Sequence, residues 1–152
     1  MSNQRNREEA VNTQLAILIS KLGVTADAET IHAHGKHRPD VLFQMFGLRV
    51  VIEGKFNDSA NAEKVVLGDA RKRVESGIAH IACAVIYPGN IRSALTTKLL
   101  DELSKGALRF AIVTETHETE WFEGAPADIM TALRRAQEAL TKDDIVEQTA
   151  KA

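Results

Sequence analysis

Two acidic residues and a lysine stand near the ends of two apolar segments that are separated by a short turn. Asp40 opens the first segment, and Glu53 and Lys55 lie near the end of the second. The segments are rich in Val, Ile, Leu and Phe, which predicts two neighbouring β-strands with the turn at residues 46–47. Charged side chains are unusual inside such strands, so these three residues are candidates for a chemical role.

The spacing of these residues predicts that they meet. A hairpin centred between Phe46 and Gly47 pairs residues whose numbers add up to 93, provided that its loop has an even length. Asp40 then faces Glu53 directly, with Cβ atoms roughly 4.5–5.5 Å apart. Lys55 lies two residues beyond Glu53, so the pleat of the strand puts both side chains on one face. A three-residue loop would shift the register and separate the three groups.

Two opposed carboxylates repel each other unless a cation lies between them. Mg²⁺, or Mn²⁺ in its place, suits such a pair because it prefers oxygen ligands and keeps several waters. The ion would polarise a phosphoryl oxygen and lower the pKa of a bound water. Asp40 and Glu53 are therefore candidate metal ligands, and the carbonyl of Gly54 is a further one. Lys55 is expected to orient the water or to offset charge on the phosphate.

The same residues also have a purely structural interpretation. Charged residues commonly lie at strand ends, and a Pro-Asp pair or a Glu-x-Lys tripeptide occurs often by chance. A structural interaction domain with a coincidental motif is therefore one alternative.

The segment "RPD" at 38–40, followed after twelve residues by "EGK" at 53–55, resembles the motif of the PD-(D/E)XK nuclease superfamily. The resemblance covers roughly residues 8–87. It implies an α/β protein with a restriction-endonuclease-like core, in which a mixed central β-sheet is flanked by helices in the order helix, three strands, helix, strand. A C-terminal extension of helix, strand and helix would follow.

The resemblance also assigns roles to residues. It implies that Asp40 and Glu53 bind Mg²⁺ and that Lys55 assists hydrolysis of a DNA or RNA phosphodiester. Many members of the superfamily add a glutamate from the first helix, which points to Glu8 or Glu9. The phase of the helix favours Glu8, because it lies on the inward stripe of apolar residues.

Basic residues close to the aspartate are candidates for contacts with a nucleic-acid backbone. Lys36, His37 and Arg38 precede it directly, where they are natural phosphate ligands, although a solvated loop is the alternative. Arg71, on the next predicted helix, is a fourth candidate. It and its two basic neighbours fan over most of a helical turn, so the three cannot all face one ligand.

Two further groups of residues leave more than one interpretation open. His32 and His34 alternate on a predicted strand and would suit a transition metal, but polar residues near the active site are the favoured interpretation. Trp121 and Phe122 could stack on a base, but a packing role is favoured.

The composition predicts one globular domain. The 152 residues are 44 % hydrophobic and 26 % charged, which is typical of a soluble protein. The formal net charge of −2 excludes a general binder of polyanions by bulk charge. Cys83 is the only cysteine, which excludes a disulfide framework. The polar N-terminus and the lack of an apolar run near the roughly 20 residues of a membrane span predict a cytoplasmic protein without membrane contact.

Hydrophobic periodicity and turn residues divide the chain into alternating elements. A single domain is expected over 1–142, and residues 143–152 are expected to be a tail or linker. The predicted elements are a helix at 8–22, a short strand at 30–34, strands at 40–46 and 48–56, a helix at 58–77, a strand at 78–88, a helix at 90–106, a strand at 107–115 and a helix at 126–142.

We therefore expect an Mg²⁺-dependent endonuclease or exonuclease that acts on nucleic acid, with DNA favoured by the resemblance alone. A homodimer, or attachment to further domains of a larger protein, fits this expectation. The alternative is a catalytically silent or masked nuclease-like domain that binds nucleic acid or acts as an assembly module.

Overall fold

The computed structural model describes residues 8–23, 30–31, 41–45, 47–57, 61–105 and 107–151, and they form an α/β protein. The strands are β1 (Thr30–Ile31), β2 (Val41–Met45), β3 (Leu48–Phe56), β4 (Ile81–Tyr87), β5 (Leu108–Thr114) and β6 (Phe122–Gly124). The helices are α1 (Glu8–Gly23), α2 (Ala62–Glu75), α3 (Gly89–Ser93), the 3₁₀ helix η2 (Thr96–Lys98), α4 (Leu99–Lys105) and α5 (Pro126–Lys151).

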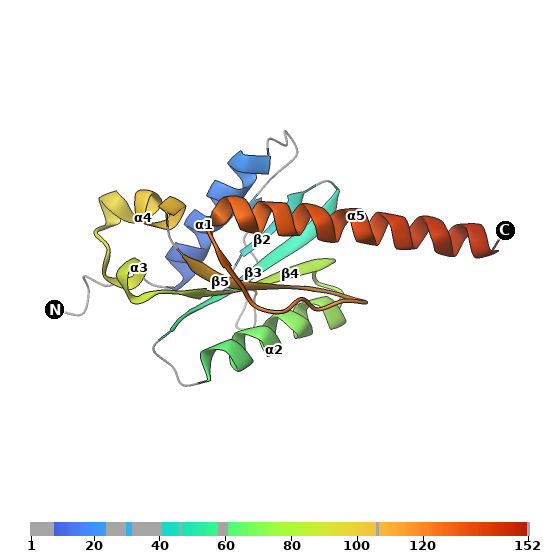
Figure 1. Ribbon diagram of the computed structural model, residues 1–152, viewed down its shortest axis with the longest axis horizontal. Coiled ribbons are helices and arrows are strands. Elements are labelled where there is room, and N and C mark those ends of the chain that lie inside the picture. The colour runs from blue at the N-terminus through green and yellow to red at the C-terminus, as the bar shows by residue number, and fades with distance from the viewer. Residues whose placement is uncertain are drawn as a thin grey trace.

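The strands form one mixed sheet in which they lie side by side in chain order. Figure 1 labels β2 to β5 of this sheet. β3 and β4 are parallel, and helix α2 makes the crossover between them. The other described neighbours are antiparallel. All seven residues of β4 are buried, which fits a continuous apolar strand with helices on both faces of the sheet.

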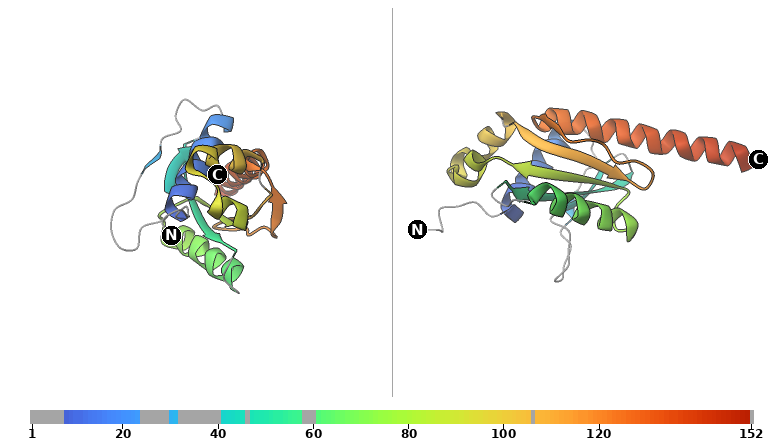
Figure 2. Two further views of the ribbon diagram at one scale, coloured as in Figure 1. Left: turned by 90° about the vertical axis from the view of Figure 1, so that its left-hand side faces the viewer. Right: turned by 60° about the horizontal axis from the view of Figure 1, so that its bottom comes forward.

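The helices cover opposite faces of the sheet (Figure 1, Figure 2). Among the described helices, α2 covers one face, which we call the α2 face, and buries small residues at every fourth position. Helices α1, α4 and α5 cover the other face and contribute to a larger apolar cluster. Alternate residues of β3 divide between the two cores, with Val51 in the first and Val50 and Ile52 in the second.

β2 and β3 form the predicted hairpin. The five described pairs run from Val41 opposite Ile52 to Met45 opposite Leu48, so the residue numbers of each pair add up to 93. Gly47 in the two-residue loop has φ +79°, a left-handed conformation that glycine adopts without steric cost. The predicted register and the even loop length are therefore confirmed for the described pairs.

The prediction of one continuous helix at 90–106 is wrong. Ala94, which follows α3, has extended backbone angles with ψ 144°, and the chain re-enters helical structure only at η2 and α4. The hydroxyl of Ser93 donates to the carbonyl of Gly89 at 3.2 Å, and the next turn contains two β-branched threonines. These residue types are weak helix formers, which explains the interruption.

The C-terminal extension contains one strand more than predicted. β6 pairs with β5, and the ring of Phe122 packs against that of Phe110 with centroids 5.7 Å apart. Helix α5 continues to Lys151, so most of the segment expected as a tail or linker is helical and extends past the end of the sheet (Figure 1). No helix in the described part of the chain has both the length and the apolar character needed to span a bilayer.

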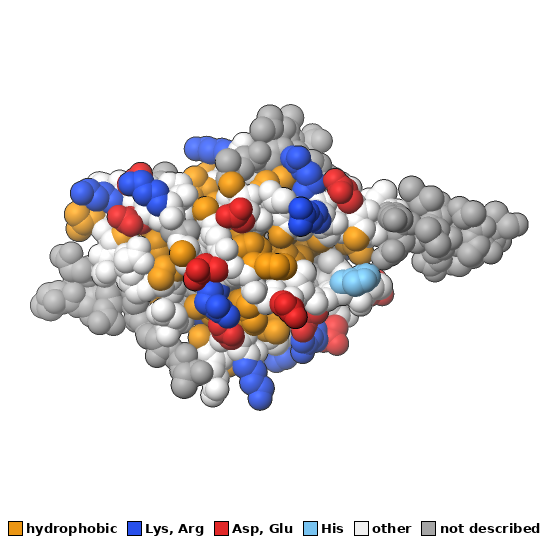
Figure 3. All heavy atoms as spheres, viewed as in Figure 1, with side chains coloured by type: hydrophobic (Ala, Val, Ile, Leu, Met, Phe, Trp, Pro, Cys, Tyr) orange, Lys and Arg blue, Asp and Glu red, His pale blue; other side chains and the backbone are white. Residues whose placement is uncertain are grey.

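The surface seen in Figure 3 carries acidic and basic side chains in alternation, with apolar side chains between them. The described residues of this face do not gather by sign of charge. This distribution agrees with the small net charge of the chain.

Candidate functional site

Glu53 is a buried acid in the middle of the sheet. It belongs to β3, points to the α2 face, and is 4 % exposed. Its partner on β4 is Ala84, whose small side chain leaves space beside the carboxylate. Burial of a carboxylate is costly unless a cation or hydrogen-bond donors stabilise it. A buried glutamate in a central strand therefore needs a partner.

Among the described residues, one such partner comes from the crossover helix α2. Nη2 of Arg73 lies 3.5 Å from Oε1 of Glu53, and only 18 % of the arginine side chain and 6 % of the glutamate side chain are exposed. The guanidinium thus occupies the position of a cation at the candidate metal ligand. Sequence analysis considered the basic cluster of α2 but selected Arg71 from it.

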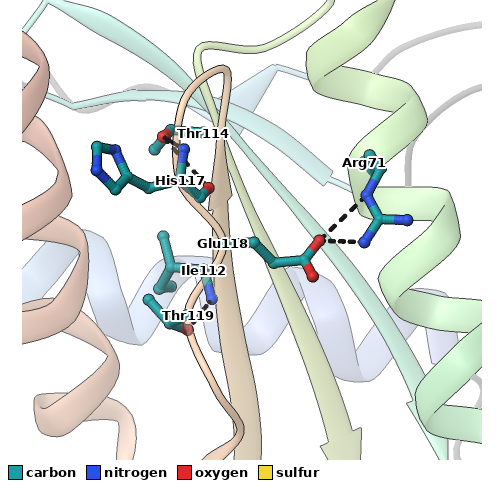
Figure 4. Close-up of polar contacts among 6 residues, drawn as sticks. All are labelled: Arg71, Ile112, Thr114, His117, Glu118 and Thr119. Atoms are coloured by element: carbon teal, nitrogen blue, oxygen red, sulfur yellow. Dashed lines mark hydrogen bonds and ion pairs between the residues drawn. The ribbon is translucent and has the colours of Figure 1, made fainter.

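Arg71 has a different contact. Its Nε donates to Oε1 of Glu118 at 3.1 Å, and its Nη2 contacts the same oxygen. Figure 4 shows Glu118 reaching Arg71 from the segment that follows β5, while His117 points to the opposite side, toward α5. Hydrogen bonds from Thr114 N to His117 O at 2.8 Å and from Ile112 N to Thr119 Oγ1 at 2.9 Å hold that segment in place.

Lys55 lies on the same face of β3 as Glu53, two residues farther along the strand, and is half-buried. Its partner on β4 is Ile86. Within the described residues, Lys55 has no ion pair with a carboxylate. The structure therefore brings the lysine and one of the two predicted acids together on one side of the sheet.

The second predicted acid, Asp40, lies outside the described residues, one position before the first described pair of the hairpin. The predicted phosphate ligands Lys36, His37 and Arg38 also lie outside them, as do His32 and His34. Glu8 is the first residue of α1, but its side chain and that of Glu9 are not among the described ones.

Gly54 lies between Glu53 and Lys55, and a side chain at this position would point to the face of the sheet opposite α2. That face has no space for one. A Cβ at this position would lie 2.1 Å from Oδ1 of Asn12 and 2.6 Å from Cε2 of Tyr87. The hydroxyl of Tyr87 donates to Oδ1 of Asn12, and both side chains are fully buried. Helix α1 and β4 therefore hold the backbone of the Glu-Gly-Lys segment directly.

Sequence analysis missed Asn12, although a signal was present. The residue is polar but lies next to Val11 on the buried stripe of α1. Its Nδ2 is buried and has no hydrogen-bond partner among the described residues. A polar residue within the apolar face of an otherwise regular helix is a usual mark of a specific contact.

The carboxylate of Glu53 offers oxygen ligands, the type that a hard divalent ion prefers. Among the described residues, the guanidinium of Arg73 lies beside these oxygens. The described residues contain no cluster of three or more acidic, histidine or cysteine side chains suited to a metal. A site on Glu53 thus depends on Asp40 for its second carboxylate.

Arg49 and His80 stabilise the start of β3, at the end of the strand away from Glu53 and Lys55. Nε and Nη2 of Arg49 donate to the carbonyls of Ile78 at 2.9 Å and Gly77 at 3.1 Å. The backbone N–H of Arg49 donates to Nδ1 of His80 at 2.9 Å. Burial and, to a smaller extent, the charge of Arg49 lower the pKa of His80. The imidazole is therefore a neutral acceptor in a structural contact.

Comparisons with known proteins do not add to this description. No protein family, curated protein or solved structure matches this chain. Inference of a function therefore rests on the geometry of Glu53, Lys55 and their neighbours.

Proposed function

We propose that this chain is a metal-dependent nuclease that hydrolyses phosphodiester bonds of DNA or RNA at a site built on Asp40, Glu53 and Lys55. The observation that carries the proposal is the register of the β2–β3 hairpin. Its five described pairs have the alignment that, continued by one residue, brings Asp40 opposite Glu53. The burial of Glu53 and its position on the same face as Lys55 support the same site.

The arrangement of elements supports a restriction-endonuclease-like core. A helix, three antiparallel strands, a crossover helix and a fourth strand parallel to the third follow one another from α1 to β4. β5, β6 and α5 then extend the sheet and cover it. This is the order that the motif resemblance implies.

In this proposal each residue has a separate task. Asp40 and Glu53 hold the Mg²⁺ ion, with the carbonyl of Gly54 as a further ligand. When bound, the ion supplies Lewis acidity toward a phosphoryl oxygen and lowers the pKa of a water. The ammonium group of Lys55 positions the attacking water and offsets charge that builds on the phosphate. Glu8, at the start of α1, is the candidate for an additional acid.

One observation favours a second candidate function. Arg73 neutralises Glu53 in the described structure, so the pair can persist as a structural ion pair that keeps metal away. The domain would then be a catalytically silent module that binds nucleic acid or assembles with other domains.

Titration with Mn²⁺ separates the two candidates. The nuclease predicts binding of Mn²⁺ by the wild-type protein and a loss of affinity of at least about tenfold in Asp40→Asn and in Glu53→Gln, because each removes a charged ligand. Glu123→Gln, an exposed acid on β6, is the matched control and should bind as the wild type does. Binding that is equal in all four proteins would contradict a site on these two acids.

A further inference from the structure

A hollow of about 670 Å³ lies on the α2 face, beside the row of residues that contains Lys55. We propose that this hollow, the Trp121 pocket, binds a nucleobase of a single nucleic-acid strand whose phosphate lies at Lys55. The inference rests on the proposed function. The polar and aromatic side chains that define the pocket are Asn57, Asn61, Glu63, Lys64, Arg109 and Trp121.

The register of the sheet connects the pocket to the candidate site. Lys55 pairs with Ile86, Ile86 pairs with Arg109, and Arg109 pairs with Glu123. The four residues form one row across four strands, and residues in one row share a face. Lys55 and Arg109 are two strand spacings apart, about 10 Å at roughly 4.8 Å per strand. The sugar and base of a neighbouring nucleotide can bridge this distance.

Planar groups form one wall of the pocket. The carbon Cζ of Arg109 lies 5.8 Å from the centroid of the Trp121 ring, within the range of a cation–π contact. Nε of Arg109 donates to Oε2 of Glu63 at 2.6 Å, which fixes the guanidinium from the other side. Trp121 packs against the apolar cluster of the α2 face and is only partly buried. Indole and guanidinium groups of this kind stack on bases.

The charges of the pocket favour a base over a phosphate. Lys64 and Arg109 are matched by Glu63 and Glu123, so the four charged side chains of the lining cancel. A neutral cavity does not attract the backbone, whereas the exposed amide of Asn57 offers both a donor and an acceptor to the edge of a base. The phosphate of the strand binds at Lys55 and not in the pocket.

The fluorescence of Trp121 reports on the pocket directly, because this residue is the only tryptophan of the chain. The full wild-type chain, kept in EDTA so that metal-dependent cleavage is suppressed while Lys55 is retained, is titrated with single-stranded decamers of deoxyadenylate and of adenylate, with a blunt DNA duplex, and with free dAMP. Quenching that saturates with either single strand is the expected result. The duplex and free dAMP should quench at least about tenfold less well at equal concentration, because neither anchors an unpaired base through a neighbouring phosphate.

Variants test the stacking itself by the anisotropy of a labelled strand. Trp121→Leu and Arg109→Met should each weaken binding about tenfold, the order of effect measured for stacked bases. Trp121→Phe keeps an aromatic ring and should remain within about threefold of the parent. Phe122→Leu is the matched control, because Phe122 is exposed but packs against Phe110 instead of lining the pocket.

The two proposals fail separately. If Trp121→Leu and Trp121→Phe both bind and cleave as the parent proteins do, or if no strand quenches the fluorescence, the Trp121 pocket is refuted and the nuclease is not. If strands bind and quench but the wild-type protein cleaves nothing with Mg²⁺ or Mn²⁺, the nuclease is refuted and the pocket stands as a binding site. Equal quenching by the duplex would also refute recognition of an unpaired base.

Discussion

Gly54 joins the candidate site to the core, because it lies between Glu53 and Lys55 on one side and against Asn12 and Tyr87 on the other. An alanine Cβ at this position would overlap Oδ1 of Asn12 and the ring of Tyr87. We expect Gly54→Ala to lower the free energy of unfolding by about 2–3 kcal/mol, measured by urea titration, because a rigid core must shift to admit it.

Gly68 provides the control for this substitution. It lies within α2, and a Cβ there would meet nothing within 4 Å. Gly68→Ala should raise the free energy of unfolding by about 0.5–1 kcal/mol, because alanine favours the helix. Equal effects of the two substitutions would contradict the close approach at Gly54.

His80 makes the stability of the fold depend on pH. Its pKa is lowered from 6.5 by burial and by Arg49, so the unfolded chain takes up a proton near pH 6.5 that the folded protein does not. The contribution of His80 to the free energy of unfolding should therefore be fully retained above pH 6.5 and be lost as the pH decreases through and below that value.

The substitution His80→Asn tests this assignment. It retains an acceptor for the N–H of Arg49 and removes the titrating group. Urea titrations at pH 7.5 and 5.5 should show a smaller decrease in the variant than in the wild type. An equal decrease in both proteins would assign the pH dependence to other groups.

Helix α2 contacts the candidate site through Arg73, which forms an ion pair with Glu53. If the guanidinium and the metal compete for Glu53, Arg73→Gln should tighten binding of Mn²⁺, because the competing cation is gone. Without metal the same variant should be less stable by about 3 kcal/mol, since one partner of a largely buried pair is lost. Calorimetric titration and urea unfolding measure the two effects.

Lys72→Gln is the matched control, because Lys72 is exposed on the same helix. It should change neither quantity appreciably. Weaker binding of Mn²⁺ by Arg73→Gln would show that Arg73 orients Glu53 for the metal instead of competing with it.

Local sequence patterns predicted the hairpin well, because alternating side chains and a short glycine-containing loop determine its register over a few residues. The contacts of Arg73 and Asn12 were not predictable in the same way. They depend on how α2 and α1 pack across the sheet, and the chain separates Asn12 from Tyr87 by 75 positions. The interruption of the helix near Ala94 was not predicted either, because it depends on small differences in helix propensity between neighbouring residues.

At the scale of the whole molecule, charge does not identify the partner. The net charge is −2, and the described residues of the face in Figure 3 alternate in sign. Binding of a nucleic acid would therefore depend on a few contacts around Lys55 and the Trp121 pocket, and on the basic segment at 36–38. With few phosphates neutralised, we expect the affinity for a strand to depend only weakly on salt.

We propose that Lys55 acts together with Asp40 and Glu53 in metal-dependent hydrolysis. Cleavage of plasmid, single-stranded DNA and RNA with Mg²⁺ or Mn²⁺ tests it most directly, in the wild type, in Lys55→Met and in Lys98→Met, an exposed lysine of η2 that serves as control. We expect cleavage by the wild type and the control, and at least about a hundredfold less by Lys55→Met with folding intact by circular dichroism. Equal metal-dependent cleavage by all three proteins, or none by the wild type, would contradict the claim.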